Sequence, residues 1–267
     1  MTGAVHHLNC GTMSLAVTVG ERLAPRRIVA HCLLIERAGG LTLVDTGFGM
    51  GDVRNPKRLT PSSRMLLRPR LVEDETAVAQ IRALGHDPAD VTDIVLTHMD
   101  FDHVGGLGDF PAATVHVYAA ELDAATHPRL RERARYVEAM WAHGPQWRPV
   151  PEAGDDWLGL RSVTALDDDV VLLPLHGHTR GHCGVAVRLP TGGWLLHAGD
   201  CYFDAREAHE PPACAPGLAM FQRMMATNHR LRMDNLERVR ELRSAHSADV
   251  DVFCAHAAAD FDRFSAG

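Results

Sequence analysis

The sequence lacks paired cysteines and long apolar runs, which argues against two classes of protein. Its six cysteines form no C-x-x-C pair and have no regular spacing. In a chain without an evident export signal, they are expected to be free thiols rather than a disulfide framework. No apolar run approaches the roughly 20 residues that a membrane-spanning helix needs. We therefore expect neither a disulfide-stabilised secreted domain nor a membrane partner.

Basic residues are also outnumbered, and the first ten residues contain no long apolar segment. The 267 residues include 27 Lys and Arg against 34 Asp and Glu, which gives a net charge of −7 at pH 7. General nucleic-acid binders are usually basic, so no nucleic-acid partner is expected. Residues 1–10 do not resemble a signal peptide, which favours a cytoplasmic location. The length suits one large α/β domain, and we predict a single domain over residues 1–267.

The most informative segment is THMDFDHVGG, residues 97–106, which directly follows the apolar residues 94–96. Such a short apolar run is typical of a buried strand. The segment places four potential metal ligands at the rim of the expected sheet: His98, Asp100, Asp102 and His103. Imidazole is a good ligand for zinc and iron, and carboxylate for harder cations. The mixed set therefore indicates a transition-metal site.

Three further candidate ligands each follow another short apolar run. They are Asp200, His256 and His178, the last in a Gly-containing turn that also holds His182. Open α/β sheets hold their sites at the carboxyl ends of the strands, where these residues are expected. We predict that the three complete the metal site and that His182 orients one of the ligands. No ligand role is predicted for four other histidines, His6, His7, His176 and His197.

Taken in the order of the chain, the candidate ligands resemble the signature of the metallo-β-lactamase-fold hydrolase superfamily. That signature reads H-x-H-x-D-H, followed by a distant His, an Asp and a final His. Residues 43–47, LVDTG, also match the early Asp of the superfamily, here Asp45. The resemblance extends from about residue 31 to residue 256 and departs at one position, where Asp100 replaces the second His. Among family members, the di-iron flavoproteins carry a Glu at that position.

The resemblance implies an α/β fold, an αββα sandwich of two similar halves with metals at the seam. It also implies a binuclear centre in which two divalent ions share a hydroxide nucleophile. The ions are expected to be zinc, or iron or manganese because Asp100 adds a carboxylate. The implied ligands are three for each ion and one bridging carboxylate: His98, Asp100 and His178 for the first, Asp102, His103 and His256 for the second, and Asp200 between them.

Within the superfamily, the motif spacing is most similar to that of the N-acyl-homoserine-lactone hydrolases. We therefore expect a hydrolase that opens a lactone or carboxylic ester, with Asp102 orienting the nucleophile and accepting its proton. That branch typically carries a Tyr three residues after the bridging Asp, where this chain has Phe203. Tyr202 is predicted to donate its hydroxyl to the developing oxyanion. The alternatives are a phosphodiesterase or thioesterase of the same fold, or a di-iron oxidoreductase-like protein.

Apolar residues after the bridging Asp indicate the character of the substrate. Binding pockets for small molecules are usually lined by such side chains, so the substrate is expected to have an apolar portion. The alternative is that these residues only pack a helix against the sheet. The set comprises Tyr202, Phe203, Met220, Phe221, Met224 and Met225.

A weak internal repeat predicts two similar halves. Residues 33–45 and 185–200 each contain two apolar runs around a Gly-Gly pair, which is a good hairpin signal. Residues 89–98 and 248–256 resemble each other in the same way, and each follows an expected helical stretch. These stretches are 73–84, with Gly85 as a C-terminal stop, and 220–243, which is predicted to be one long helix or a pair.

Two segments fit neither half of the repeat. Residues 52–71 carry six Lys and Arg and no acid after Asp52. We expect a loop that clamps an anionic substrate, forms the arm of a homodimer or is simply solvated. Residues 121–150 are expected to be helical up to about Met140. The following Trp141 and Trp147 either form the floor of a pocket for a small-molecule substrate or attach this segment to the core.

Overall fold

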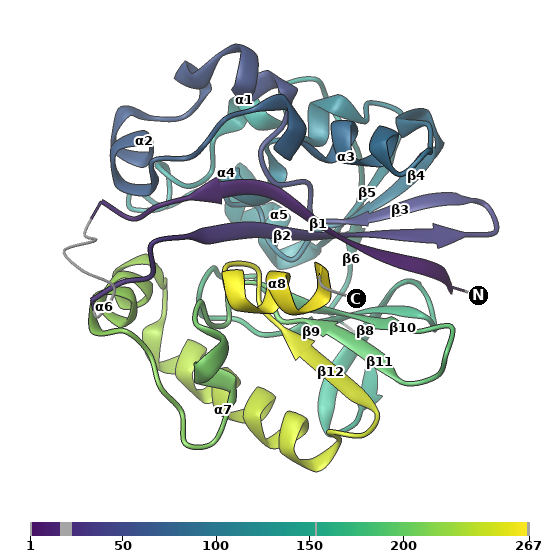
Figure 1. The fold of residues 1–267 in the computed structure, drawn as a ribbon, viewed down its shortest axis with the longest axis vertical. Helices are drawn as coiled ribbons and strands as arrows, with labels where there is room; N and C mark the ends of the chain where they lie inside the picture. Colours follow the sequence, from purple (N-terminus) through teal and green to yellow (C-terminus); the bar gives the residue numbers. More distant parts are fainter. Residues whose placement is uncertain (1, 17–22, 153, 266–267) are drawn as a thin grey trace.

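Two six-stranded sheets pack against each other, and helices cover their outer faces (Figure 1). The computed structural model describes residues 2–16, 23–152 and 154–265. The first sheet has the strand order β1-β2-β3-β4-β5-β6, and the second has the order β12-β11-β10-β9-β8-β7. This arrangement confirms the predicted αββα sandwich. The single domain over residues 1–267 stays a prediction, and residues 1, 17–22, 153, 266 and 267 lie outside the described ranges.

The elements alternate between strands and short helices along the chain. The first sheet contains β1 (Thr2–Met13), β2 (Ile28–Arg37), β3 (Gly40–Val44), β4 (Val91–Val95), β5 (Thr114–Tyr118) and β6 (Gln146–Val150). The second contains β7 (Asp155–Trp157), β8 (Leu160–Asp167), β9 (Val170–Pro174), β10 (Cys183–Arg188), β11 (Trp194–His197) and β12 (Val250–Phe253). The α-helices are α1 (Met50–Arg54), α2 (Pro61–Leu67), α3 (Ala77–Ala83), α4 (Phe101–Val104), α5 (Ala119–Thr126), α6 (Pro216–Met225), α7 (His229–Ala245) and α8 (Ala258–Ser265). Among the described residues, no helix is both long and apolar enough to cross a bilayer.

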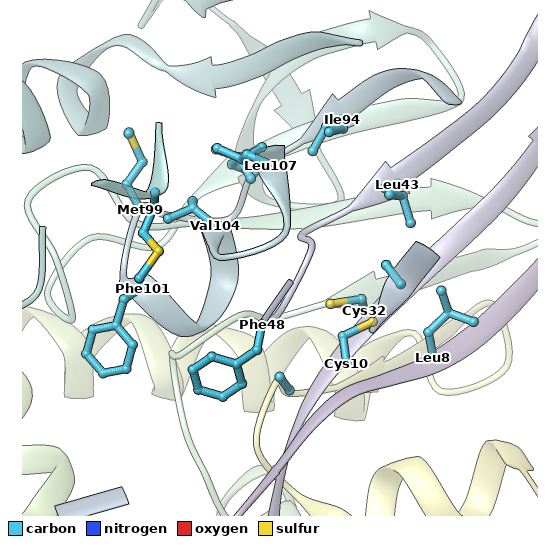
Figure 2. Close-up of a cluster of buried hydrophobic side chains, with 14 of the residues drawn as sticks. Leu8, Cys10, Cys32, Leu43, Phe48, Ile94, Met99, Phe101, Val104 and Leu107 are labelled. Carbon is cyan, nitrogen blue, oxygen red and sulfur yellow. The ribbon is translucent and has the colours of Figure 1, made fainter. Parts of the chain in front are cut away.

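The central strands of the first sheet are largely buried on both faces, as β2 illustrates. Successive side chains of a strand point to opposite faces. Leu33 and Ile35 belong to the apolar layer between the two sheets. Cys32 and Leu34 belong instead to the cluster beneath the helices of the first half, part of which Figure 2 shows. The sheet is therefore held between two apolar layers, and its polar ligands emerge where the strands end.

The internal repeat is confirmed by the strand pairing. β2 and β3 form an antiparallel hairpin, and so do β10 and β11. β4 then lies parallel to β3, and β12 lies parallel to β11. Because parallel strands end at the same edge of a sheet, each half brings two carboxyl-terminal strand ends together.

The two predicted helical stretches are present with different bounds: the first is shorter, and the second extends further at both ends. α3 begins after Thr76, whose hydroxyl accepts a hydrogen bond from the Ala79 N–H, a standard N-cap. It stops at Gly85, which has a φ of +89°, a conformation that favours glycine. The second stretch is a pair of helices, α6 and α7, because Asn228 caps a new helix by accepting from the Leu231 N–H.

Two sequence predictions about the remaining segments are wrong. Residues 52–71 are not a loop, because they form the end of α1, a 3₁₀ turn and α2, with Leu59 and Leu67 buried against the first core cluster. The helix predicted up to Met140 ends at Thr126, and turns follow it. Its sequence, rich in charged residues, indicated a helix, but the chain turns inward instead to bury Glu132, Arg135 and Tyr136.

Candidate metal centre

All seven predicted ligands lie at strand ends along the seam between the sheets. β4 is followed by His98 and Asp100, with Asp102 and His103 in α4 just beyond. The second half contributes residues after β9, β11 and β12. Two buried groups have their potential ligand atoms within 4.8 Å of one another: His98, His178 and Asp200, and Asp102, His103 and His256.

The spacing within and between these groups suits divalent ions. A tetrahedral site with bonds of about 2.1 Å has edges of about 3.4 Å. In the first group, Asp200 Oδ2 lies 3.2 Å from His178 Nε2 and 3.7 Å from His98 Nε2. In the second, His256 Nε2 lies 3.7 Å from Asp102 Oδ2.

Asp200 contacts both groups. Besides its contacts in the first group, its Oδ2 lies 3.1 Å from His256 Nε2, and its Oδ1 lies 3.3 Å from His103 Nε2. Burial opposes ionisation of this carboxyl, but the surrounding imidazoles more than offset that effect and hold its pKa well below the usual range. This position is the one that a bridging carboxylate needs.

Buried polar atoms without partners provide a test of whether metal ions fit. His98 Nε2, His103 Nε2 and Asp200 Oδ1 are buried and have no hydrogen-bond partner. Leaving such an atom unsatisfied costs on the order of 1–3 kcal/mol. All three atoms face the same small volume and are ligand atoms for a divalent cation. The residues present therefore fit a metal centre.

Asp45 fixes one of the ligands in place. Its carboxylate accepts hydrogen bonds from the Thr97 N–H at 2.8 Å, the Thr97 hydroxyl at 2.7 Å and His103 Nδ1 at 2.8 Å. With its Nδ1 proton donated to Asp45, His103 presents the Nε2 lone pair to the metal site. His256 is oriented in the same way, because its Nδ1 lies 2.7 Å from the Val29 carbonyl oxygen.

His182 positions Asp200 through its backbone. His182 Nδ1 donates to the Leu175 carbonyl at 2.8 Å, so Nε2 accepts the Asp200 N–H, also at 2.8 Å. Burial and the neighbouring imidazoles of His98 and His178 lower the pKa of His182 well below its usual value, which keeps Nε2 an acceptor. This geometry agrees with the predicted orienting role, although the contact is to an amide rather than to a carboxylate.

Asp100 reaches the first group but is also paired with a buried arginine. Its Oδ2 lies 3.0 Å from His178 Nε2 and 3.6 Å from His98 Nε2, while its Oδ1 lies 3.5 Å from Arg135 Nε. Burial alone would raise the pKa of Asp100, but Arg135 and the two imidazoles hold it well below the usual range. The guanidinium offsets the extra negative charge that the sequence assigned to this site, and ligation by Asp100 stays a prediction.

Two functional residues were missed by the sequence prediction. Arg135 also donates to the His178 carbonyl at 2.9 Å. The buried carboxylate of Glu121 accepts from the Met99 N–H at 3.0 Å and from the Thr179 hydroxyl at 2.7 Å, so it ties together two ligand-bearing loops. Both lie in the charged segment that was predicted to be a helix, and no local pattern marks either as buried.

The placement of Tyr202 contradicts its predicted role as a donor at the site. Its side chain is fully buried in the core cluster of the second half, which also contains residues of α7. The neighbouring Phe203 faces the metal centre, with its ring centroid 4.5 Å from that of His256 and 5.9 Å from that of His178. Because the backbone turns after Asp200, the two adjacent side chains point into different environments.

A narrow, largely apolar cleft opens onto the metal centre. Phe203, Phe221 and Met225 line it as predicted, whereas Met220 and Met224 are about two-thirds exposed on the solvent side of α6. Its free volume of about 20 Å³ is enough for about one water molecule, so a larger ligand requires movement of the apolar wall. The lining consists of Ile28, Leu67, Asp100, Phe101, Asp102, His178, Asp200, Phe203, Phe221, Met225 and His256.

Two other predicted contributors to the cleft are not among its lining residues. Trp141 and Trp147 pack against the first core cluster, which supports the alternative that they attach their segment to the core. No arginine of residues 52–71 lines the cleft, although Leu67 does. The clamp for an anionic substrate therefore has no support in the described lining, and the dimer arm stays a prediction.

The two-layered sheet fold, with the candidate ligands in this order along the seam, defines the class of protein as one with the metallo-β-lactamase fold. The family model of the Metallo-beta-lactamase superfamily matches residues 26–245, and the chain belongs to this superfamily. The chain is 43% identical over 256 residues to a probable metallo-hydrolase of Mycobacterium tuberculosis, covering 94% of this chain and 79% of the relative. It is 32% identical over 190 residues to an N-acyl homoserine lactonase of Azorhizobium caulinodans, covering 71% of this chain and 70% of that protein.

Solved structures show the same fold. An N-acyl homoserine lactone hydrolase with the product N-hexanoyl-L-homoserine at its catalytic metal center superposes with a TM-score of 0.74, at 21% identity, over 98% of this chain and 96% of that chain. AidC, a dizinc quorum-quenching lactonase, superposes with a TM-score of 0.58, at 15% identity, over 96% of this chain and 86% of that chain. The resemblance to the lactonase-like branch is confirmed, and the family and relatives support a metal-dependent hydrolase.

Proposed function

We propose that this chain is a metal-dependent hydrolase that opens a lactone or another carboxylic ester with an apolar portion. One observation carries the proposal: the carboxylate of Asp200 contacts imidazoles of both ligand groups at the floor of an apolar cleft. Similarity to N-acyl homoserine lactonases favours a cyclic ester over a phosphodiester or thioester. The substrate is a small molecule, and a cytoplasmic location and a homodimer stay predictions.

We propose that two divalent ions are held by the ligand groups described above, with Asp200 between them. Such ions act as Lewis acids and bring the pKa of bound water towards 7. Zinc is the first candidate, since AidC is a dizinc lactonase. Iron or manganese remains the alternative because of the additional carboxylate of Asp100. The charge of Arg135 weakens that alternative, because it offsets the carboxylate.

The residues of the chain itself would orient the substrate and move the proton. Asp102 lies in the second ligand group, with its Oδ2 3.7 Å from His256 Nε2, and it also lines the cleft, so its carboxylate is placed to orient the attacking water and accept its proton. Phe203 and Phe221 would contact the apolar portion of the ester and exclude bulk water. The described lining of the cleft contains no Ser or Cys nucleophile, which favours direct attack by water.

The proposal is tested by assaying wild-type protein, Asp102→Asn and Tyr202→Phe on long- and short-chain lactones, thioesters, phosphodiesters and β-lactams. We expect turnover of lactones, preferentially with long acyl chains, and a loss of at least ~10²-fold in kcat for Asp102→Asn. Tyr202→Phe is the matched control, since its hydroxyl lies outside the cleft, and should keep its kcat. Efficient cleavage of phosphodiesters without turnover of any lactone or ester would contradict the proposal.

A further inference from the structure

Three side chains outside the metal centre converge on a single oxygen atom. Glu36 Oε1 lies 2.8 Å from His6 Nε2 and 3.3 Å from His86 Nε2. The potential ligand atoms of all three residues lie within 4.8 Å of one another. Nothing in the sequence pattern predicted His6 as a ligand, because the three residues are far apart in the chain.

The fold brings these residues together from three elements. His6 lies on β1 opposite Leu34 of β2, and Glu36 is two residues further along β2, so the two side chains are diagonal neighbours on one face. His86 follows Gly85 at the end of α3, and its N–H donates to the Ile81 carbonyl at 3.1 Å. The hydrogen bond at the end of α3 therefore fixes the backbone position of His86, which provides the second imidazole.

This cluster lies at the opposite end of the first sheet from the metal centre. Glu36 pairs with Leu41 near the beginning of β3, whereas Asp45, which orients His103, follows the end of that strand. The side chains of His6, Glu36 and His86 are 27%, 38% and 30% exposed, so an ion from solution can reach them. The cluster is therefore spatially and chemically separate from the hydrolase site.

We propose that His6, Glu36 and His86 form an additional binding site for a divalent transition-metal ion such as zinc. Two imidazoles and one carboxylate are a ligand set that zinc accepts, with water completing the coordination at a partly exposed site. The contact of 3.3 Å between His86 and Glu36 is close to the edge of about 3.4 Å of a tetrahedral zinc site, and the contact of 2.8 Å between His6 and Glu36 would lengthen when an ion binds. A bound ion would join β1, β2 and the segment after α3, and it would stabilise the folded state because the unfolded chain lacks this arrangement.

The same contacts also suit a carboxylate that accepts two imidazole hydrogen bonds, and zinc titration distinguishes the two cases. Untagged, metal-stripped protein is loaded with excess zinc, desalted and analysed for zinc per chain. We expect wild-type protein to retain one zinc more than Glu36→Gln and His86→Ala. This difference does not depend on how many ions the hydrolase site holds. Zinc should also raise the melting temperature of wild-type protein more than that of either variant.

His127→Ala is the matched control. His127 Nδ1 lies 3.2 Å from Asp123 Oδ1, but this exposed pair has no third ligand in any group of the described residues. The control should retain as much zinc as wild-type protein. Replacing zinc with cobalt gives a second readout, because wild-type protein should show a component of visible cobalt absorption, in addition to that of the hydrolase site, that is missing from Glu36→Gln.

Equal zinc content in wild-type protein, Glu36→Gln and His86→Ala would overturn the proposal and leave a hydrogen-bonded cluster. An equal loss in His127→Ala would also overturn it, since binding would then be non-specific. Glu36→Gln is nearly isosteric and partly exposed, so it should fold. The melting temperature of Glu36→Gln in chelator shows whether this variant folds. If it does not fold, His6→Gln is used in its place.

Discussion

At the scale of single residues, the Asp100–Arg135 pair distinguishes this centre from the superfamily pattern. Both side chains are more than nine-tenths buried, and Arg135 Nε lies 3.5 Å from Asp100 Oδ1. A buried pair contributes little net stability, but removing one partner leaves an uncompensated charge and costs about 3–5 kcal/mol. Asp100 and Arg135 therefore act as a unit, in which the arginine makes a carboxylate tolerable where the family has a histidine.

The first prediction is that Arg135→Met lowers the free energy of unfolding of metal-free protein by ~3 kcal/mol or more. The double variant Asp100→His with Arg135→Met should be less destabilised than the sum of the single variants, because neutral histidine needs no cation beside it. Denaturant unfolding in chelator measures all four proteins. Additive effects would mean that the two side chains are not coupled. Asp100→His should also raise the zinc occupancy relative to iron.

At the scale of elements, the sequence correctly predicted those strands and helices whose positions are determined by local patterns. Short apolar runs that stop at polar clusters correctly located β4 and β12, and hence His98 and His256. Residues 52–71 were predicted to be a loop because they carry many charged side chains. The burial of Leu59 and Leu67 depends on contacts with the rest of the core, which the local sequence does not indicate. The direction of the Tyr202 side chain could not be predicted from the sequence either. One turn of the backbone determines which of the two adjacent aromatic side chains enters the cleft.

Helix α8 offers a prediction about pH. Asp260, in its first turn, accepts the Cys254 N–H at 3.3 Å, which links the helix to the end of β12. Burial raises the pKa of this carboxyl to about 6. The folded state thus holds a proton that the unfolded chain has already released, so this contribution to stability is present at low pH and is lost as the pH rises through about 6.

We therefore expect Asp260→Asn to gain stability relative to wild-type protein as the pH rises. Asn keeps an acceptor for the Cys254 N–H and has no charge to bury. The difference in the free energy of unfolding between variant and wild type should increase by ~1 kcal/mol between about pH 5 and about pH 8. Denaturant titrations at the two pH values measure it. A constant difference would show that Asp260 does not titrate in this range.

At the scale of the whole molecule, the candidate metal centre takes its ligands from both halves of the sandwich. The first ligand group takes His98 from the first half and His178 and Asp200 from the second. The second group takes Asp102 and His103 from the first half and His256 from the second. Each ion would therefore cross-link both sheets, in addition to the apolar layer that already lies between them.

The last prediction is that chelation lowers the melting temperature, because ions that bind only the folded chain stabilise it. At a thousand-fold excess over Kd the effect is ~4 kcal/mol, which corresponds to on the order of 10 °C for a chain of this size. Asp200→Ala should lose the two ions of the metal centre by elemental analysis and respond to chelator less than wild-type protein. His178→Ala and His103→Ala should each lose about one ion. Chelator should lower their melting temperatures by less than that of wild-type protein and by more than that of Asp200→Ala. If active, metal-loaded wild-type protein melts at the same temperature with and without chelator, the ions do not hold the halves together.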